Sequence, residues 1–502
     1  MTTPDPAAIQ HITSLLSVLT QPNTDAIRQA ESLLKPLLKQ PQTMEILWHI
    51  ITATTSSDPT VRHVAAIVLR KRLPGHFDAW DANTQHQWQH HVLQTILSEQ
   101  VRPVRTALIA VAATLFRNGP PTPTILEFLT GAVNAGGSAR EAAYCLLSEM
   151  TIAVGEHWKA HAPALAQLLH QALQPPTEAA TQRAAVQALG QLLSFWSDDP
   201  TELNVILPLL PPMLQVAATK LDDDDLLTSV LEVLYDLAYS THTLEQLPVT
   251  LEFCWSLLSN RSLDVRIRDS AALGIATNAE TKPKSFAKQT ALVQRMVDTL
   301  FSLMQESTAS AAGSLLDQSG LNTGGDDDDY DDEDDGPTEM SMAQGTLDSL
   351  ACELPTNVMW EICYPKCVAL CQSPEPNARK AGVAGLGVIT EGCALKMVEQ
   401  LATIVPAVLA LAQDAAPPVR ECACFCLGQV AEHCQPEILE YSAEILPRVF
   451  GLLDDATPSV QTTSCYVLEI FCERLEPAAV RPVLDALVRK LGSMLELSLI
   501  HI

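Results

Sequence analysis

YPKCVALCQSPEPNARKAGVAGLGVITEG, residues 364–392, is the stretch that decides the fold, because the chain repeats its pattern twice more. The second copy is VPAVLALAQDAAPPVRECACFCLGQVAEH at 405–433, and the third is LPRVFGLLDDATPSVQTTSCYVLEIFCER at 446–474. The copies align without a gap at a period of 41 residues. The residues shared by all three are Pro365, Pro406 and Pro447; Leu370, Leu411 and Leu452; Pro376, Pro417 and Pro458; Leu386, Leu427 and Leu468; and Glu391, Glu432 and Glu473. A fixed period of this length is typical of a stacked repeat protein.

Each copy predicts two helices. In the second copy, Val405, Val408, Leu409 and Ala412 recur at helical spacing, and the proline is expected near the N-terminus of this first helix, where a missing N–H costs little. A short turn with Asp and Pro follows, and the second helix is expected to begin near Val419. An antiparallel pair of about 40 residues that cannot bury both faces alone is the HEAT type of repeat.

Looser copies of the second helix occur upstream, each with an arginine in a comparable place. These arginines are Arg62, Arg105, Arg140, Arg183 and Arg266, at intervals of 43, 35, 43 and 83 residues. We therefore predict an all-α protein, an α-solenoid of about ten or eleven HEAT repeats. The predicted segments are repeats at 1–100 and 101–305, a flexible acidic insertion at 306–343, and repeats at 344–502 that end in mid-repeat.

The last segment predicts one helix without a partner. Val483, Leu484, Leu487 and Leu491 suit the first helix of another repeat, but no second helix follows before the final LSLIHI. We expect an N-terminal portion of a longer solenoid, or a partner that covers this apolar end.

Charge is strongly negative and partly concentrated in one place. Lys and Arg number 31 against 59 Asp and Glu, a formal net charge of −28, and nine of these acids lie in DDDDYDDEDD at 326–335. Direct binding to nucleic acid is disfavoured, because neutralising phosphates requires basic side chains. The acidic run has two interpretations: a solvated segment that only aids solubility, or a mobile polyanion that engages a basic patch of a partner.

No catalytic motif is present, so we expect neither an enzyme nor a cofactor. Asp331 to Gly336 resembles the start of a calcium loop, but Met342 replaces the required final Glu. Cys363, Cys367 and Cys371 share a helix face, yet their spacing favours buried thiols over a metal site. The 13 cysteines are odd in number and show no paired spacing, which predicts reduced thiols. The absence of a signal sequence and of a long apolar run predicts no membrane association.

Three glutamates suggest a binding surface. Glu391, Glu432 and Glu473 are expected toward the C-terminal ends of second helices, where the helix dipole disfavours a carboxylate. A basic guest could offset this cost, but shared repeat ancestry explains the recurrence equally well. We therefore treat the three as cargo-binding candidates.

Two stretches resemble a known family. AESLLKPLLKQPQTMEILWHIITATTSSDPTVRHVAAIVLRKRL at 30–73, followed by Trp80, resembles the N-terminal domain of importin-β-type nuclear transport receptors. The acidic insertion, TLDSLACELP from Thr346 and RKAGVAGLGVITEG from Arg379 narrow the resemblance to the importin four class.

The resemblance implies a monomeric nuclear import receptor that shuttles between cytoplasm and nucleus. Its implied partners are Ran-GTP, basic cargo such as histones and ribosomal proteins, and FG nucleoporins, the last on apolar segments such as 203–216 and 251–258. The positions implied for Ran are Arg70, Lys71, Arg105, Asp326, Asp327, Asp328, Asp329, Asp331, Asp332, Glu333, Asp334 and Asp335. For Arg62 and Arg105 an alternative stays open, since such an arginine often only ties one repeat to the next. The alternative function is a HEAT scaffold of another class, such as a phosphatase scaffold.

Overall fold

The computed structural model describes residues 4–54, 58–77, 79–117, 124–175, 177–307, 338–475, 481, 484–485 and 487–493. Helices are the only regular secondary structure among these residues, which confirms the all-α prediction. The chain divides into two compact units, Met1–His242 and Thr243–Ile502. The predicted segment boundaries at residues 100 and 305 do not coincide with this division.

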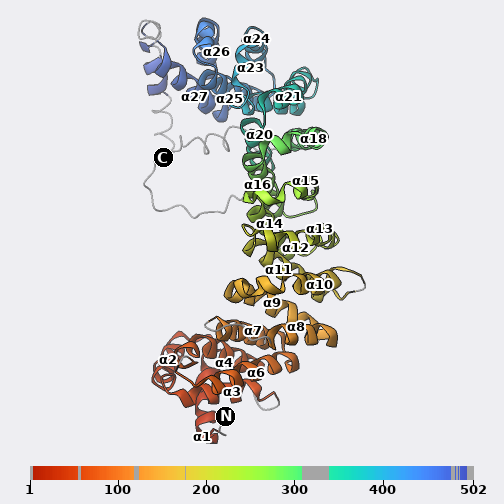
Figure 1. Cartoon of the computed structure of the whole chain (residues 1–502). Helices are drawn as coiled ribbons and strands as arrows, with labels where there is room; N and C mark the ends of the chain where they lie inside the picture. Colours follow the sequence, from red (N-terminus) through yellow and green to blue (C-terminus); the bar gives the residue numbers. More distant parts are fainter. Residues whose placement is uncertain are drawn as a thin grey trace. The chain divides into compact units, whose positions relative to one another are not determined.

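The first unit is built from short and medium helices in chain order (Figure 1). They are α1 (Pro6–Val18), α2 (Thr24–Leu37), α3 (Pro41–Thr52), α4 (Pro59–Arg72), α5 (Pro74–Phe77), α6 (Ala82–Ser98), α7 (Arg102–Phe116), α8 (Thr124–Ala135), α9 (Gly137–Trp158), η1 (Lys159–His161), α10 (Ala162–Leu173), α11 (Ala179–Phe195), α12 (Pro200–Ile206), η2 (Leu207–Leu209), α13 (Leu210–Ala218) and α14 (Asp224–Tyr239).

The second unit continues the succession of helices after the 3-10 helix η3 (Thr241–Gln246). Its helices are α15 (Leu247–Ser259), α16 (Val265–Thr281), α17 (Pro283–Ala287), α18 (Thr290–Glu306), α20 (Glu339–Glu353), α21 (Thr356–Cys371), α22 (Pro376–Val388), α23 (Ala394–Val398), α24 (Leu401–Leu411), α25 (Pro417–His433), η4 (Glu437–Tyr441), α26 (Ser442–Leu452) and α27 (Pro458–Arg474).

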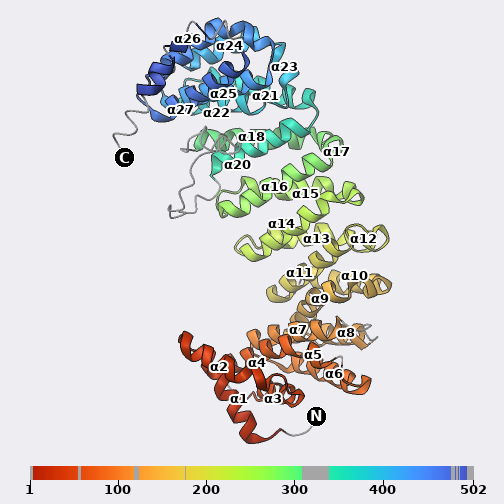
Figure 2. The same ribbon diagram turned by 90° about the vertical axis from the view of Figure 1, so that its left-hand side faces the viewer.

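Helix pairs stack through their second helices. In the first unit α4, α7, α9, α11 and α14 each contact the next, and Figures 1 and 2 show them following one another. In the second unit α16, α20, α22, α25 and α27 do the same. Together with the pair α1–α2, the described residues hold eleven helix pairs, which confirms the predicted solenoid of ten or eleven repeats.

The start of each second helix follows from its sequence. Pro376, Pro417 and Pro458 occupy the first positions of α22, α25 and α27, where their fixed φ suits the helix and no N–H is needed. In the first unit, the Asp58 carboxylate accepts a 2.8 Å hydrogen bond from the N–H of Thr60 at the start of α4. Local capping therefore fixes where these helices begin.

The other set of repeated prolines was placed wrongly. Pro365, Pro406 and Pro447 lie in the interiors of α21, α24 and α26, and not near their N-termini. All three are solvent-exposed, as are the residues four positions earlier, whose carbonyls lose their helical partner. Because water can reach this side of the helix, the repeat tolerates the interruption.

Repeated arginines tie consecutive pairs together in the second unit. Nε and Nη2 of Arg379 donate to the two carboxylate oxygens of Asp414 at 2.7 and 2.9 Å, and Arg420 binds Asp455 in the same way at 2.7 and 2.8 Å. In each case the guanidinium lowers the pKa of the aspartate. Gln461 replaces the arginine in the third copy. Its side-chain amide donates a 2.6 Å hydrogen bond to the Asp455 carbonyl but has no carboxylate partner among the described residues.

The upstream member of this series is Arg268 and not Arg266. Arg268 is 3% exposed, and its Nε donates to the Leu258 carbonyl at 3.1 Å while Nη1 donates to Glu339. Arg266 is exposed. The misplacement by two residues arose because both arginines lie in the same short motif, VRIRDS.

The acidic insertion is shorter on its C-terminal side than predicted. α18 ends at Glu306, but α20 already begins at Glu339, so residues 339–343 are helical and do not belong to the insertion. Thr338 and Ser341 form a capping box: the Thr338 hydroxyl accepts from the Ser341 N–H at 3.0 Å, and the Ser341 hydroxyl accepts from the Thr338 N–H at 2.9 Å. This start signal follows the acidic run closely and was not recognised.

Candidate functional site

Arg70 and Lys71 lie where a partner could reach them. Both are exposed in the last turn of α4, the second helix of its pair, where positive charge complements the helix dipole. Lys71 also borders a groove of about 340 Å³ between α1, α2 and α4. The structure therefore leaves these two predicted residues available for binding.

Arg105 has a different environment. It is 7% exposed; its Nη1 donates to the Glu99 carbonyl at 3.2 Å and its Nη2 to the Glu141 carboxylate at 3.1 Å. Arg62 is similarly engaged, with Nε on the Ile51 carbonyl at 2.8 Å and Nη2 on Glu99. The contacts of both arginines are those of side chains that link one repeat to the next. They argue against Arg105 as a contact for a partner.

The acidic residues 326–335, predicted as a Ran contact, lie outside the described residues. The structure describes the two apolar segments expected to bind nucleoporins, and large apolar side chains of both are buried. Leu203 and Met213 are fully buried, as are Leu251 and Leu258. These side chains form the core of their repeats and do not present an apolar surface.

The three candidate glutamates are all exposed at or beyond the ends of second helices. Glu473 lies in the last turn of α27, and Glu432 in the last turn of α25, where it accepts a 3.0 Å hydrogen bond from the Tyr466 hydroxyl. Glu391 was expected within a helix but lies three residues beyond the end of α22. Its position is set by the turn that follows.

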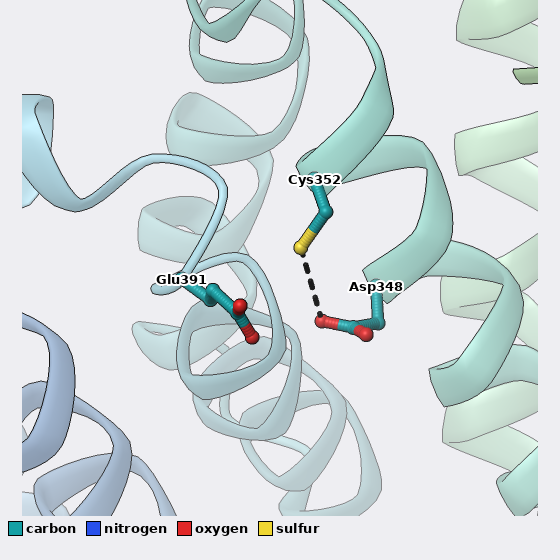
Figure 3. A group of neighbouring side chains, drawn as sticks. All are labelled: Asp348, Cys352 and Glu391. Atoms are coloured by element: carbon teal, nitrogen blue, oxygen red, sulfur yellow. Dashed lines mark hydrogen bonds between the residues drawn. The ribbon is translucent and has the colours of Figure 1, made fainter. Parts of the chain in front are cut away.

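This turn packs tightly against α20. A Cβ at Gly392 would lie 2.0 Å from the Ala351 carbonyl oxygen, so only glycine allows the approach. The approach places Glu391 beside Asp348 and Cys352 of α20, and the three side chains point toward one another (Figure 3). One ligand atom from each lies within 4.8 Å of the others.

Two carboxylates dominate the electrostatics of this group. The Cys352 thiol donates to Asp348 at 3.8 Å, and His433 Nε2 lies 4.0 Å from the Glu391 carboxylate. Burial and the nearby Glu391 carboxylate raise the pKa of Asp348 to about 6, although Cys352 and His433 oppose the shift. Burial and the two carboxylates raise the pKa of Cys352 to about 12. The group can hold a cation, but a metal would first have to displace the proton from the thiol.

Asp348 also borders a pocket of about 470 Å³ between α16 and α20. The pocket includes Asp269 and Leu273, and the Leu273 side chain is 55% exposed. Burial raises the pKa of Asp269. Acidic and apolar groups therefore meet on this face of the second unit.

Sequence reasoning missed Asp348. It precedes Glu391 by 43 residues, whereas Glu432 and Glu473 follow at intervals of 41. Extending the 41-residue period by one copy toward the N-terminus reaches Leu350, so the period alone would not have found Asp348. Cys352 had no periodic signal either, because only the fold of the turn after α22 brings it near.

The cysteines considered as metal ligands belong mainly to the core. Cys363 and Cys367 are fully buried in α21, and burial raises the pKa of both thiols. No helix of the described residues combines the length and apolar composition required to cross a membrane.

Three family profiles match the sequence. The profile "Importin-beta N-terminal domain" matches residues 30–114, "IPO5-like, TPR repeats" matches 100–253, and "HEAT-like repeat" matches 376–430 and 417–471. Importin-4 of Mus musculus is 26% identical over 394 residues, and importin-4 of Homo sapiens is 26% identical over 391. These alignments cover 77% and 75% of this chain but 35% of each relative. The chain thus spans about a third of the length of the curated relatives it matches.

Solved structures of Kap121p share the fold. Kap121p alone gives a TM-score of 0.79 at 22% identity over 98% of this chain and 47% of that chain. Kap121p bound to RanGTP gives 0.78 at 22% identity over 97% and 47%. The profiles and the importin-4 relatives support an importin-β family receptor close to importin-4 and importin-5, and the Kap121p structures share its fold.

Proposed function

We propose that the chain acts in nuclear import: it binds basic cargo in the cytoplasm, docks on FG nucleoporins, and releases cargo when Ran-GTP binds. The observation that carries the proposal is the series Glu391, Glu432 and Glu473, which places exposed acids at 41-residue spacing along the second unit, with Asp348 beside the first of them. A basic segment crossing several repeats would meet one carboxylate in each.

Relatives support the classes of partner. Kap121p structures have been solved with RanGTP, with Pho4p and with Nup53p, and one mutant of Kap121p replaces two aspartates and a glutamate by lysine. By analogy, we propose Ran-GTP, cargo and nucleoporins as partners of this chain. Histones and ribosomal proteins are the proposed cargo, because both are basic and complement the acidic surface.

The mechanism needs no catalysis. Exposed carboxylates attract a basic segment over a distance set by the ionic strength, and neighbouring apolar groups such as Leu273 add contact area. Ran-GTP would bind near Arg70 and Lys71, and the same chain would then lose affinity for cargo because the two binding events are coupled. The receptor would cycle between cytoplasm and nucleus.

A pull-down tests the Ran part. The chain should retain Ran loaded with GTP and not Ran loaded with GDP, and Arg70→Ala with Lys71→Ala should weaken retention. A matched control is Arg28→Ala with Lys39→Ala, which removes two exposed charges from the same unit. Equal binding of both nucleotide states, or none, contradicts the proposal. Co-purification with a phosphatase catalytic subunit would instead favour a scaffold.

A second experiment tests the cargo surface. Glu391→Lys with Glu432→Lys should abolish binding of a labelled Lys/Arg-rich peptide and of core histones. Glu361→Lys with Glu444→Lys, at exposed positions of α21 and α26, is the charge-matched control and should bind normally. Equal losses in the two variants would mean that net charge, and not this surface, governs binding.

A further inference from the structure

Metal-ligating side chains from three separate elements meet in the second unit. Asp348 and Cys352 belong to α20, Glu391 lies in the turn after α22, and His433 is the last residue of α25. Figure 3 shows the side chains of Asp348, Cys352 and Glu391 pointing toward one another. Together with His433 they offer carboxylate, thiol and imidazole groups, which are the three kinds of ligand that zinc takes in proteins.

The spacing of the ligand atoms suits a single ion. One atom each from Asp348, Cys352 and Glu391 lies within 4.8 Å of the other two, and the Cys352 Sγ lies 3.8 Å from the Asp348 Oδ1. Around tetrahedral zinc, bonds of about 2.0–2.2 Å to oxygen and about 2.3 Å to sulfur place neighbouring ligand atoms about 3.3–3.6 Å apart. Shifts of about 1 Å in the exposed side chains of Cys352 and Glu391 therefore suffice to bring the three atoms to one ion.

The backbone holds the three residues in place without an ion. Asp348 and Cys352 lie four residues apart and share one face of α20. Glu391 is held against this helix by the close approach of Gly392 to Ala351, which no larger residue would allow. An ion would therefore meet a site whose elements are already in position.

The two carboxylates have little positive charge near them. Within the described residues neither Asp348 nor Glu391 pairs with a Lys or Arg; His433, with Nε2 at 4.0 Å, is the basic group beside Glu391, and Lys396 pairs with Glu399. Asp348 is only partly exposed, and burial together with the Glu391 carboxylate raises its pKa to about 6. Partly buried carboxylates of this kind are stabilised by a bound cation.

The mixture of ligands selects the metal. Calcium and magnesium take oxygen ligands, whereas the Cys352 sulfur favours a softer ion such as zinc. Asp348 also borders the pocket of about 470 Å³ between α16 and α20, so water can reach the ion from that side.

We propose that Asp348, Cys352 and Glu391 bind one Zn²⁺ ion, with water at the fourth position and His433 as a positioning residue for Glu391. Zinc forms one bond to the Cys352 sulfur and one to an oxygen of each carboxylate. The thiol proton passes to solvent, and nothing is oxidised or reduced. Because this thiol has a pKa of about 12, protons compete with the metal, and the affinity should be lower than at a site of several thiolates.

Zinc at this site would have a consequence for cargo. Glu391 is also a proposed cargo contact, so bound zinc should weaken the binding of a basic peptide. This consequence rests on the proposed import function, whereas zinc binding itself does not.

The probe is Co²⁺ added to the full chain under reducing conditions, because a cobalt–thiolate bond gives a near-ultraviolet charge-transfer band that carboxylates and imidazoles do not give. We expect one equivalent of Co²⁺ to produce the band and Zn²⁺ to remove it. Cys352→Ser should abolish the band, while Cys472→Ser, at another partly exposed thiol, should retain it.

The remaining variants test the oxygen ligands and the positioning residue. Asp348→Asn and Glu391→Gln should each weaken Co²⁺ binding by about tenfold or more, since the loss of even a supporting partner costs about 10–100-fold. His433→Gln should weaken binding but keep the thiolate band. Circular dichroism checks that each variant keeps its helices.

The proposal is overturned if the unmodified chain gives no thiolate band, or if the band persists in Cys352→Ser. A second titration follows a labelled Lys/Arg-rich peptide with and without Zn²⁺. Zinc that binds through Cys352 without weakening the peptide would support the metal site and count against Glu391 as a cargo contact, so the failures of the two proposals are distinguishable.

Discussion

Replacing Arg62 by methionine tests whether the ion pair between Arg62 and Glu99 stabilises the first repeats of the chain. Arg62 and Glu99 are each only 2% exposed and form an ion pair. The Arg62 Nε also donates to the Ile51 carbonyl at 2.8 Å, and Glu99 accepts from the Val101 N–H at 2.8 Å. The substitution removes the positive charge and leaves the Glu99 carboxylate buried without it.

The expected cost follows from this environment. Breaking a buried ion pair by removing one partner costs about 3–5 kcal/mol, because the remaining charge is not compensated. Glu99→Met alone should cost a similar amount, since it leaves the guanidinium buried. In Arg62→Met with Glu99→Met neither charge remains, and the loss should fall to about 1–3 kcal/mol from the two backbone hydrogen bonds.

Hydrogen exchange is the suitable assay, because a stack of repeats need not unfold in one step and a global midpoint would be ambiguous. Exchange is followed by mass spectrometry in peptides from α3, α4, α6 and α7. At about tenfold per 1.4 kcal/mol, each single variant should speed exchange there by roughly a hundredfold or more. If the double variant loses as much protection as the two single variants combined, the pair is not coupled and the tie is refuted.

Three further predictions concern the second unit. The pKa of Asp348 is raised to about 6, so its ionisation lowers the stability of the folded state as pH rises from about 4 to 6; Asp348→Asn should therefore stabilise the unit at pH 7 by about 3 kcal/mol and have no effect at pH 3, as urea titrations can measure. Arg420→Gln should destabilise α25–α27 less than Arg420→Ala, since Gln461 keeps its carbonyl bond in the same place; equal losses in hydrogen exchange would contradict this. Native-state maleimide labelling at pH 7.5, read by mass spectrometry, should spare the buried thiols Cys363, Cys367, Cys422, Cys424 and Cys426, whose pKa values burial raises.

The repeat could be predicted from sequence because its signals are local and periodic. Leu386, Leu427 and Leu468 repeat at the spacing that stacking requires, and Pro376, Pro417 and Pro458 mark helix starts by their chemistry. The interior prolines were predicted wrongly because local propensity disfavours proline inside a helix. Pro406 is tolerated in α24 because that side of the helix is exposed and water can replace the lost hydrogen bond.

Binding residues were harder to predict, because burial and neighbours depend on packing between repeats. Arg70 and Arg105 look alike in sequence, yet one is exposed at the end of α4 and the other is buried against Glu141. Likewise, Asp348 and Cys352 meet Glu391 only because Gly392 lets the turn approach α20.

Release of cargo by Ran-GTP is the most direct test of the proposed import function. A labelled basic peptide is first bound to the chain, and Ran loaded with either GTP or GDP is then titrated into the complex while fluorescence anisotropy is followed. We expect Ran-GTP to displace the peptide bound at Glu391 and Glu432, whereas Ran-GDP should leave it in place. Retention of the peptide in the presence of saturating Ran-GTP would contradict this expectation.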